Sequence, residues 1–331
     1  MMKHYYRLVD LPTEEVLSLL DRAVYWRRNP HGEALRHKEI VLLFLDPSLR
    51  TRASFEVAVR SLGGHVTTFG PEAIWPLESL PGAVMDQDRV EHVNEAAGVL
   101  SRYYDGIGIR SLARWRNKGE DLQDLTLSGF LARAQVPTFN MESAMYHPCQ
   151  ALGDLLTIRD LLEGFEGRKI TITWTYHPRA LPMSVTNSIL LATCKMGMNV
   201  TLAHPPEFTL TTGIMELAKA EAEKSGATLE VSHDRLEALR GAEIVYAKSW
   251  GGLKRYEDPA QEAAERNRYR DWIVDREAMS MTRRGYFMHC LPVRRNVVAT
   301  DEVLDSAASV VMPQAENRLH VQKALMEWLY V

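Results

Sequence analysis

A group of hydroxyl and cationic side chains follows the first strand-like run of the chain. The pentapeptide Ser-Leu-Arg-Thr-Arg occupies residues 48–52, between an apolar run at 40–45 and a segment with helical spacing at 54–60. Where a strand enters a helix, backbone N–H groups and the helix dipole favour an anion, hydroxyls add donors, and arginine binds two oxygens at once. The pentapeptide therefore indicates a phosphate site, although serine and threonine at a helix start commonly act only as caps.

Two further segments carry residues that could take part in catalysis. His-Pro-Cys-Gln at residues 147–150 precedes a helical segment, and His-Cys-Leu-Pro at residues 289–292 follows a strand-like run at 285–288. A cysteine beside a histidine can act as a nucleophile, and a histidine at a helix start can be purely structural. The residues by themselves leave these roles open.

Taken in order, Ser-x-Arg-Thr-Arg, His-Pro-x-Gln and His-Cys-Leu-Pro resemble the transcarbamylases, the enzymes that move a carbamoyl group from carbamoyl phosphate to an amine. The likeness covers nearly the whole chain, from the N-terminal helix to Glu-Asn-Arg-Leu-His at residues 316–320. Matching segments at the family's spacing make the resemblance highly specific. It implies a carbamoyltransferase that needs no cofactor and no metal ion.

The resemblance also implies a role for each residue of a carbamoyl-phosphate site. Phosphate would be held by the backbone N–H of Leu49 and by the side chains of Ser48, Arg50, Thr51, Arg110 and Arg318. His147, with Arg110, would donate to the carbonyl oxygen, where charge develops. Gln150 and the backbone carbonyls of Cys290 and Leu291 would accept from the carbamoyl NH2 group. Arg110, His147, Gln150 and Cys290 form the expected catalytic group. Because the amine attacks directly in this family, Cys290 is expected to line the pocket rather than act as a nucleophile.

The second substrate is indicated by the segment that replaces an ornithine-binding loop. Ornithine transcarbamylases carry Asp-x-x-x-Ser-Met-Gly, whose aspartate holds the α-amino group, whereas residues 245–251 read Val-Tyr-Ala-Lys-Ser-Trp-Gly. An aspartate that binds an ammonium group gains no ion pair from an acylated, uncharged nitrogen. Lys248 instead offers a cation for a carboxylate. Segments 174–178, 247–251 and 315–323 look like the N-acetyl- and N-succinylornithine transcarbamylases.

By that resemblance Glu142, His177 and Lys248 would bind the acylated amino acid. A structural role for Glu142, as a capping or ion-paired residue, stays open. Trp75, in a loop after Pro71, matches the same group of enzymes. There the tryptophan reaches into the carbamoyl-phosphate site of a neighbouring subunit, which implies a homotrimer with shared active sites.

The acyl group is predicted from Val90. Acetylornithine enzymes have a glutamate in the loop that we align with residues 89–92, and a lysine at the position of Val298. In a poorly solvated pocket a glutamate would repel a succinyl carboxylate at a cost on the order of a few kcal/mol. Valine removes that repulsion, and Arg179 is the cation expected to meet the additional carboxylate.

We therefore predict carbamoyl transfer to the δ-amine of N-succinyl-L-ornithine, in arginine biosynthesis. N-acetyl-L-ornithine is the alternative, because a one-residue shift of the alignment would place Glu91 at the selecting position. No side chain is an obvious general base for the attacking amine.

These segments belong to a chain in which strand-like and helical runs alternate after an amphipathic helix at residues 13–28. The strand-like runs are 40–45, 64–69, 105–110, 136–141, 169–174, 199–203, 228–232, 243–247 and 285–289. The rhythm predicts an α/β fold of two doubly wound parallel-sheet domains, with the active site in the crevice between them. Residues 1–150 would bind carbamoyl phosphate and residues 151–314 the acylated amino acid. A final helix at about 315–331 would, in this family, pack back on the first domain.

Length and composition exclude several other classes of protein. The 331 residues suit about two domains, and 46% hydrophobic with 25% charged residues is typical of a soluble globular protein. A formal charge of −4 gives no reason to expect nucleic acid or an anionic membrane as partner. The three cysteines form no disulfide framework or zinc motif, and no leader or membrane span is evident, which fits the cytoplasm.

Two rival functions are disfavoured by the residues. A catalytically idle binding subunit should have lost part of the phosphate loop or of the His-Pro-x-Gln motif, and both are intact. A nicotinamide dehydrogenase needs Gly-x-Gly-x-x-Gly after a strand, but Ser111 replaces the third glycine of the segment that begins at Gly106. Residues 257–270 are dense in charge, so we expect a solvated helix or loop there, and we expect residues 253–271 to form a mobile lid over the second substrate.

Overall fold

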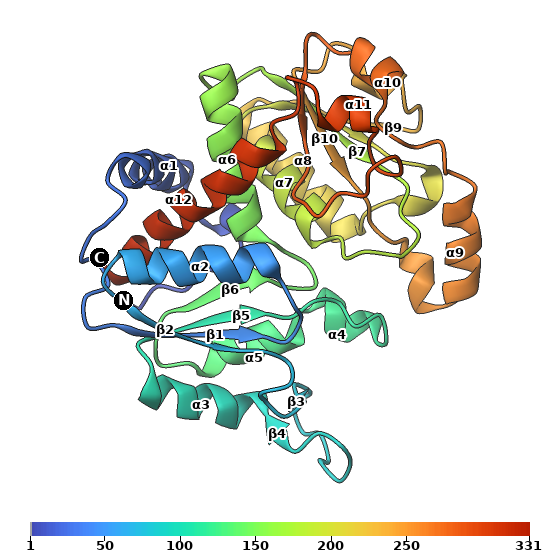
Figure 1. Cartoon of the computed structure of the whole chain (residues 1–331). Coiled ribbons are helices and arrows are strands. Elements are labelled where there is room, and N and C mark those ends of the chain that lie inside the picture. Colours follow the sequence, from blue (N-terminus) through green and yellow to red (C-terminus); the bar gives the residue numbers. More distant parts are fainter. Residues whose placement is uncertain (1) are drawn as a thin grey trace. The chain divides into compact units, whose positions relative to one another are not determined.

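The computed structural model describes residues 2–331, which divide into two compact units. The first unit runs up to Cys149 and includes Arg318–Val331, and the second unit comprises Gln150–Asn317. Each unit contains its own parallel sheet with flanking helices (Figure 1), so the predicted α/β fold is confirmed. No helix within residues 2–331 is long and apolar enough to cross a membrane.

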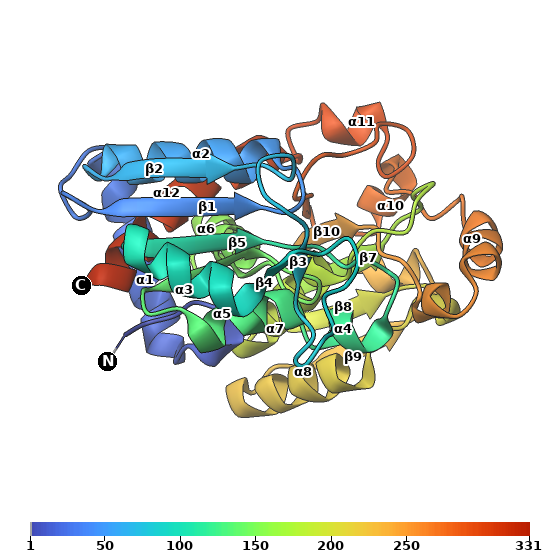
Figure 2. The ribbon, with the colours of Figure 1, turned by 90° about the horizontal axis from the view of Figure 1, so that it is seen from below.

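The sheet of the first unit has the strand order β2-β1-β5-β6, with all neighbours parallel. Its strands, which lie side by side in Figure 2, are β1 (Glu39–Phe44), β2 (His65–Phe69), β5 (Gly106–Arg110) and β6 (Thr138–Glu142). β1 is buried from its second residue onward, as expected for a parallel strand that is covered on both faces.

Helices cover both faces of this sheet (Figure 1). On one face lie α1 (Thr13–Arg28), α2 (Leu49–Ser61) and the last part of α12 (Val311–Tyr330), and on the other lie α3 (Val93–Tyr103) and α5 (Leu125–Arg133). The remaining elements of the unit are a 3-10 turn (Leu8–Asp10), α4 (Lys118–Leu122) and a two-stranded parallel ladder of β3 (Leu77–Glu78) and β4 (Glu91–His92).

The glycines of β5 have a packing role. A Cβ atom on Gly108 would lie 2.5 Å from the ring of Phe139 on the neighbouring strand, and one on Gly106 would lie 2.0 Å from the hydroxyl of Tyr330. Only glycine leaves room for these side chains to cross the strand. The glycine pair in this strand is thus accounted for by close packing and does not require a dinucleotide.

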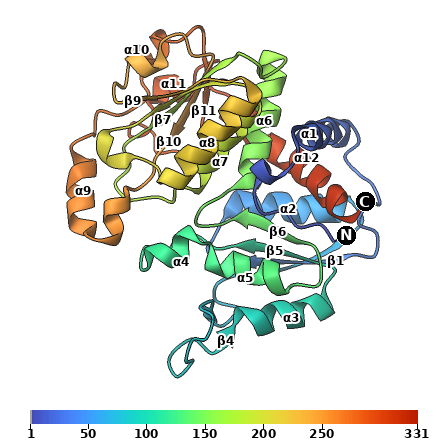
Figure 3. The ribbon, with the colours of Figure 1, turned by 180° about the vertical axis from the view of Figure 1, so that it is seen from behind.

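The second unit has a five-stranded parallel sheet in the order β11-β10-β7-β8-β9. Its strands are β7 (Lys169–Trp174), β8 (Asn199–Ala203), β9 (Leu229–Ser232), β10 (Ile244–Lys248) and β11 (Tyr286–Met288). Its helices are α6 (Pro148–Leu162), α7 (Ser184–Lys195), α8 (Thr212–Ser225), α9 (Pro259–Asn267), α10 (Arg276–Ser280) and α11 (Asp301–Leu304), with 3-10 turns at Pro206–Phe208, Glu237–Leu239 and Leu253–Tyr256. Figure 3 shows α7 and α8 side by side next to the strands.

All the predicted strands are present, with ends shifted by no more than two residues. The pair β3 and β4 was not predicted, because two residues are too few to show an alternating pattern. The charged segment 257–270 was predicted to be solvated, and for two of its residues this is wrong. Glu262 and Arg266 are 0% and 4% exposed and form an ion pair of 3.2 Å within α9.

Candidate active site

The pentapeptide that is predicted to bind phosphate forms the start of α2 in the first unit. Ser48 precedes the helix in an extended conformation, and its Oγ accepts a hydrogen bond of 3.3 Å from the backbone N–H of Thr51. Leu49 is 81% exposed, so its side chain plays no part in the core. Arg52 donates to Glu56 at 2.9 Å, so its guanidinium has a carboxylate partner on the same helix. Ser48 therefore caps α2. It lies at the N-terminus of this helix, where an anion is favoured.

The ends of the neighbouring strands β5 and β6 contribute a cation and a carboxylate. Arg110 ends β5, Glu142 ends β6, and the Arg110 guanidinium donates to Oε2 of Glu142. Both residues are 8% exposed. Since the carboxyl ends of parallel strands lie at one edge of a sheet, the two side chains meet although they are far apart in sequence.

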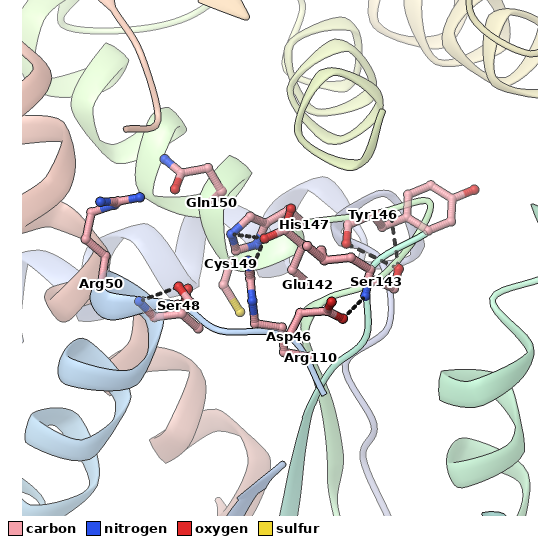
Figure 4. A network of polar contacts seen from close by, with 12 residues as sticks. Asp46, Ser48, Arg50, Arg110, Glu142, Ser143, Tyr146, His147, Cys149 and Gln150 are labelled. Atoms are coloured by element: carbon pink, nitrogen blue, oxygen red, sulfur yellow. Dashed lines mark hydrogen bonds and ion pairs between the residues drawn. The ribbon is translucent and has the colours of Figure 1, made fainter. Parts of the chain in front are cut away.

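His147 lies beside the same carboxylate (Figure 4), with its Nε2 atom 3.4 Å from Oε2 of Glu142. Its pKa is lowered to about 3, chiefly because burial disfavours the charged ring. Glu142 opposes this shift, whereas Arg318, Arg110 and Arg50 add to it. The imidazole is therefore neutral at physiological pH and can donate one N–H without bringing a further charge.

Arg318 reaches the same place from the C-terminal helix α12. It is 3% exposed, and one of its terminal nitrogens donates to the hydroxyl of Thr51 at 3.3 Å. The first unit thus gathers three arginines, a neutral histidine and two hydroxyl groups, with one carboxylate among them. Such a concentration of donors and positive charge suits a small, doubly charged anion.

The loop that carries His147 is held by a residue that the sequence analysis missed. Asp124 is 4% exposed and accepts hydrogen bonds from the Ser143 hydroxyl (2.6 Å), the Met145 backbone N–H (3.1 Å) and the Tyr6 hydroxyl (3.1 Å). Burial raises its pKa to about 6, against the effect of these hydrogen bonds. No motif marks this aspartate, because its partners are brought to it only by folding.

The second unit contains Gln150 and a buried carboxylate one helical turn later. Gln150 donates its amide NH2 to Asp154 at 2.7 Å, and Asp154 is 0% exposed. The same carboxylate accepts from Gln314 at 2.7 Å and from the Tyr246 hydroxyl at 2.8 Å. Asp154 was not predicted, although an acid at position i+4 from a glutamine on a helix is a signal for such a pair.

The His-Cys-Leu-Pro segment follows β11 in the same unit. The backbone N–H of His289 donates to Gln314 at 2.9 Å, and that of Leu291 donates to Nδ1 of His289 at 2.9 Å. The peptide bond between Leu291 and Pro292 is cis. Cys290 lies between the two anchored residues, partly exposed.

His177 and Lys248 lie near each other in the second unit. Lys248 ends β10, is 7% exposed, and donates to the Ser249 backbone carbonyl at 2.9 Å. Nε2 of His177 accepts from Arg294 at 3.0 Å, so its Nδ1 bears the proton and lies 2.8 Å from the Arg179 carbonyl. The pKa of His177 is lowered, first by burial and then by the charges of Arg294 and Lys248.

The remaining predicted residues are more exposed. Arg179 is exposed and contacts His177 through its backbone. Trp75 and Val90 belong to the first unit and are 68% and 59% exposed. Trp75 lines a cavity of about 460 Å³ together with Arg89, Leu112 and Arg114 and their neighbours, and Val90 is not among its lining residues. The structure thus groups the anion-binding residues tightly and leaves the predicted acyl-selecting residues at the surface.

Comparison with known proteins extends this picture over the whole chain. The model of the carbamoyl-P binding domain of aspartate/ornithine carbamoyltransferase matches residues 3–160, and the model of its Asp/Orn binding domain matches residues 169–329. The chain belongs to the aspartate/ornithine carbamoyltransferase family. It is an enzyme, and the resemblance seen in its motifs is confirmed.

Two relatives illustrate the branch of the family that the chain resembles. N-acetylornithine carbamoyltransferase of Xanthomonas axonopodis pv. citri (strain 306) is 43% identical over 98% of this chain and 96% of its own length. N-succinylornithine carbamoyltransferase of Bacteroides fragilis (strain 638R) is 35% identical over 88% of this chain and 87% of its own length.

Solved structures of related enzymes have the same fold as this carbamoyltransferase. One is a glutamate-to-alanine mutant of N-acetyl-L-ornithine transcarbamylase complexed with carbamyl phosphate and N-succinyl-L-norvaline. It has a TM-score of 0.97 and 42% identity over 99% of this chain and 100% of that chain. Another, acetylornithine transcarbamylase complexed with acetylcitrulline, has a TM-score of 0.96 and 42% identity over 99% of both chains.

Proposed function

We propose that this carbamoyltransferase moves the carbamoyl group of carbamoyl phosphate to the δ-amine of N-succinyl-L-ornithine. The products are N-succinyl-L-citrulline and phosphate, and the reaction serves arginine biosynthesis. The observation that carries carbamoyl transfer is the neutral, buried His147 beside the arginines of the first unit. The choice of the succinyl group depends on Val90.

Carbamoyl phosphate is a small dianion that needs two kinds of partner. Its phosphate is held by the N-terminus of α2, by Ser48, Arg50 and Thr51, and by Arg318. Its carbonyl oxygen gains negative charge during the attack and is met by Arg110 and an N–H of His147. A neutral histidine stabilises this charge as a hydrogen-bond donor without competing with the arginines for the phosphate.

The carbamoyl NH2 group needs acceptors, which are offered by the second unit. Gln150 presents an amide whose NH2 faces Asp154, so its carbonyl oxygen is the atom available to accept. The backbone carbonyls of Cys290 and Leu291 add two more acceptors. These groups select an amide over an acyl group that bears a methyl instead.

The transfer step is a direct displacement. The lone pair of the neutral δ-amine forms a bond to the carbamoyl carbon, the bond from that carbon to the phosphate oxygen breaks, and the oxygen leaves with the electron pair. The departing phosphate takes the proton that the new amide nitrogen loses. An alkylamine has a pKa of roughly 10 in water, so proximity to buried cations helps to keep it neutral.

The acylated amino acid is recognised by charge. Its α-carboxylate is held by Lys248, with His177 and Arg294 beside it, and its acylated nitrogen bears no charge that would require an aspartate. Glu142 accepts from the amide N–H. The same carboxylate accepts from Arg110, so Glu142 and the phosphate compete for this guanidinium.

The succinyl group is favoured because Val90 places no negative charge in the loop aligned with the selecting glutamate. In the related enzyme, a mutant that lacks a glutamate was complexed with N-succinyl-L-norvaline, which supports this assignment. Val298, where acetylornithine enzymes have a lysine, is 2% exposed and packs in the core of the second unit. Arg179 or Arg294 provides the cation for the additional carboxylate.

N-acetyl-L-ornithine is the second candidate acceptor, and one observation favours it. The N-acetylornithine enzyme is 43% identical to this chain and the N-succinylornithine enzyme 35% identical. Overall identity reflects ancestry across the whole chain, whereas the acyl group is contacted by few residues. We therefore give more weight to the residue at position 90.

We propose that the protein assembles into a homotrimer in the cytoplasm, and the exposed loop of the first unit offers an apolar surface for such assembly. Five large apolar side chains are exposed between Pro71 and Glu91, namely Trp75, Leu80, Val84, Met85 and Val90. Such a cluster suits a partner surface. Trp75 is then donated to the carbamoyl-phosphate site of a neighbouring subunit. Residues 1–150 with the final helix bind carbamoyl phosphate, and residues 151–314 bind the acylated amino acid.

The test is formation of citrulline derivatives from carbamoyl phosphate and three amines in parallel: ornithine, N-acetylornithine and N-succinylornithine. Turnover of the succinyl compound alone supports the proposal. Preference for the acetyl compound makes Glu91 the selecting residue, and activity on free ornithine overturns the role of Lys248. Absence of turnover with all three would identify an idle binding subunit.

A further inference from the structure

A fully buried carboxylate in the second unit receives hydrogen bonds from three different elements. Asp154 lies on α6, and its Oδ1 accepts from the side-chain amides of Gln150 and Gln314, both at 2.7 Å. Its Oδ2 accepts from the Tyr246 hydroxyl of β10 at 2.8 Å. A carboxylate removed from water requires such donors, and hydrogen bonds to a charged acceptor are about twice as strong as neutral ones.

The charge of Asp154 fixes the direction of both glutamine amides. Because an ionised carboxylate only accepts, each amide must turn its NH2 toward Asp154 and its oxygen to the opposite side. The oxygen of Gln314 accepts from the backbone N–H of His289 at 2.9 Å. The ring of His289 in turn accepts from the backbone N–H of Leu291 at 2.9 Å.

These contacts connect one side chain to all the acceptors that the proposed function assigns to the carbamoyl NH2 group. Gln150 supplies its amide oxygen directly. The backbone carbonyls of Cys290 and Leu291 belong to the segment that Gln314 and His289 hold in place. A donor in place of Asp154 would allow the Gln150 amide to reverse and present NH2 to the carbamoyl NH2.

We infer that Asp154 is the positioning residue that sets the acceptors for the carbamoyl NH2 group, and that it thereby selects carbamoyl phosphate over acyl phosphates without an N–H donor. This inference rests on the proposed function, because the roles of Gln150 and of the two backbone carbonyls come from it. Asp154 itself does not touch the substrate. It acts through the orientation of the groups that do.

A merely structural role for Asp154 predicts a different result from a positioning role. Loosening the fold weakens all ligands of the site together, whereas turning the acceptors away weakens only a ligand that offers N–H groups. Acetyl phosphate has the size and phosphate of carbamoyl phosphate, with a methyl in place of NH2. The ratio of the KM for carbamoyl phosphate to the inhibition constant of acetyl phosphate therefore separates the two roles.

The variants are Asp154→Asn, which keeps the shape and removes the charge, and Gln314→Leu, which cuts the connection to His289. The matched control is Thr157→Val, because Thr157 is also buried on α6 and its hydroxyl bonds to the Asn317 side chain and the Gly153 carbonyl, both at 2.9 Å, instead of to Asp154. Loss of one hydrogen bond to the carbamoyl NH2 corresponds to about a tenfold rise in KM for carbamoyl phosphate. Both variants should show this rise, with acetyl phosphate inhibition changed by less than about twofold.

An equal loss for both phosphates, or a ratio in Thr157→Val that changes as much as in Asp154→Asn, overturns the inference. The same binding preference can be measured by ligand-induced thermal stabilisation with each phosphate alone, which needs no turnover. If the unmutated enzyme makes no N-acylated citrulline, the proposed function fails. A preference for carbamoyl phosphate that is lost in Asp154→Asn would still support the inference.

Discussion

The two groups of predicted substrate residues differ in how they are built. In the first unit Thr51, Arg110, His147 and Arg318 are all less than 10% exposed and lie in direct contact or one neighbour apart. Among the residues predicted to bind the acylated amino acid in the second unit, Lys248 is comparably buried, whereas Arg179 and its neighbour in the site, Arg294, are exposed. The predicted anion site is thus centred on a buried cluster, whereas the predicted site for the acylated amino acid is partly exposed.

This difference in burial distinguishes the residues proposed to bind carbamoyl phosphate from those proposed to select the acyl group. Buried cations are costly unless they are paired, so each side chain of the first group depends on the others and cannot change alone. An exposed arginine or valine is replaced at little cost in stability, because water compensates for what is lost. In the proposed function, the phosphate and the carbonyl oxygen are therefore bound by buried side chains, and the acyl group is selected by exposed positions that can vary.

The strongest test of the buried cluster is His147→Ala. Loss of the donor to the developing oxyanion should lower kcat by about 10²–10³-fold. His147→Gln, which restores an N–H, should recover part of the loss. Because the pKa of His147 is about 3, its ionisation should cause no change in rate between pH 6 and 9. Steady-state kinetics decide this, and a rate unaffected by the alanine would remove His147 from the mechanism.

The stability of the protein should depend on pH through Asp124, which holds the loop that carries His147. The pKa of Asp124 is raised from 3.8 to about 6, so the folded protein binds the proton more tightly than the unfolded chain between these values. The unfolding free energy contributed by this group is therefore greatest below pH 4 and falls as the pH rises to 6. Relative to Asp124→Asn, the fall should be on the order of 3 kcal/mol between pH 4 and 7. Denaturant unfolding at several pH values measures it, and a constant difference contradicts the prediction.

Glu142 belongs to the buried cluster of the first unit but is assigned to the second substrate. Glu142→Gln therefore tests which of the two substrates depends on this carboxylate. The KM for the acylated ornithine should rise by about tenfold, since a charged acceptor is replaced by a neutral amide. The KM for carbamoyl phosphate should not rise, because Arg110 loses a competing carboxylate. Two-substrate kinetics distinguish this from a purely structural ion pair, for which only stability would decline.

Val90→Glu tests whether acyl specificity depends on the surface loop. The ratio of succinyl to acetyl turnover should fall by about tenfold, as expected for repulsion between partly solvated charges. Val84→Glu is the matched control, because it places the same charge on the same loop at a residue that is 82% exposed. Equal effects of the two substitutions would mean that position 90 does not select the acyl group.

The smallest effect is expected at Arg179. Its backbone contacts His177, whereas Arg294 bonds to the ring with its side chain. Arg294→Ala should raise the KM for the acylated ornithine about fivefold and Arg179→Ala about twofold, as is typical of exposed charges. The reverse order in the same assay would show that Arg179, and not Arg294, binds the succinyl carboxylate.

The elements and residues that were predicted from the sequence all belong to patterns of neighbouring residues, either apolar runs or short motifs. The strand ends were found to within two residues because buried parallel strands are continuous apolar runs. Asp124 was missed because its partners, such as Ser143, are distant in sequence. Asp154 has one near partner, Gln150, but its other partners, Gln314 and Tyr246, are distant. The ladder of β3 and β4 was missed because two-residue strands carry no periodicity.

The amino-acid sequence by itself determined the family, the α/β rhythm and the residue types that meet an anion, because motifs and apolar runs are properties of neighbouring residues. Only the tertiary structure decided that Arg110 is bound to Glu142, that His147 is neutral, and that Asp154 orients Gln150. These features depend on burial and on contacts between remote segments. Burial sets the cost of charge, and that cost exists only once the chain has excluded water.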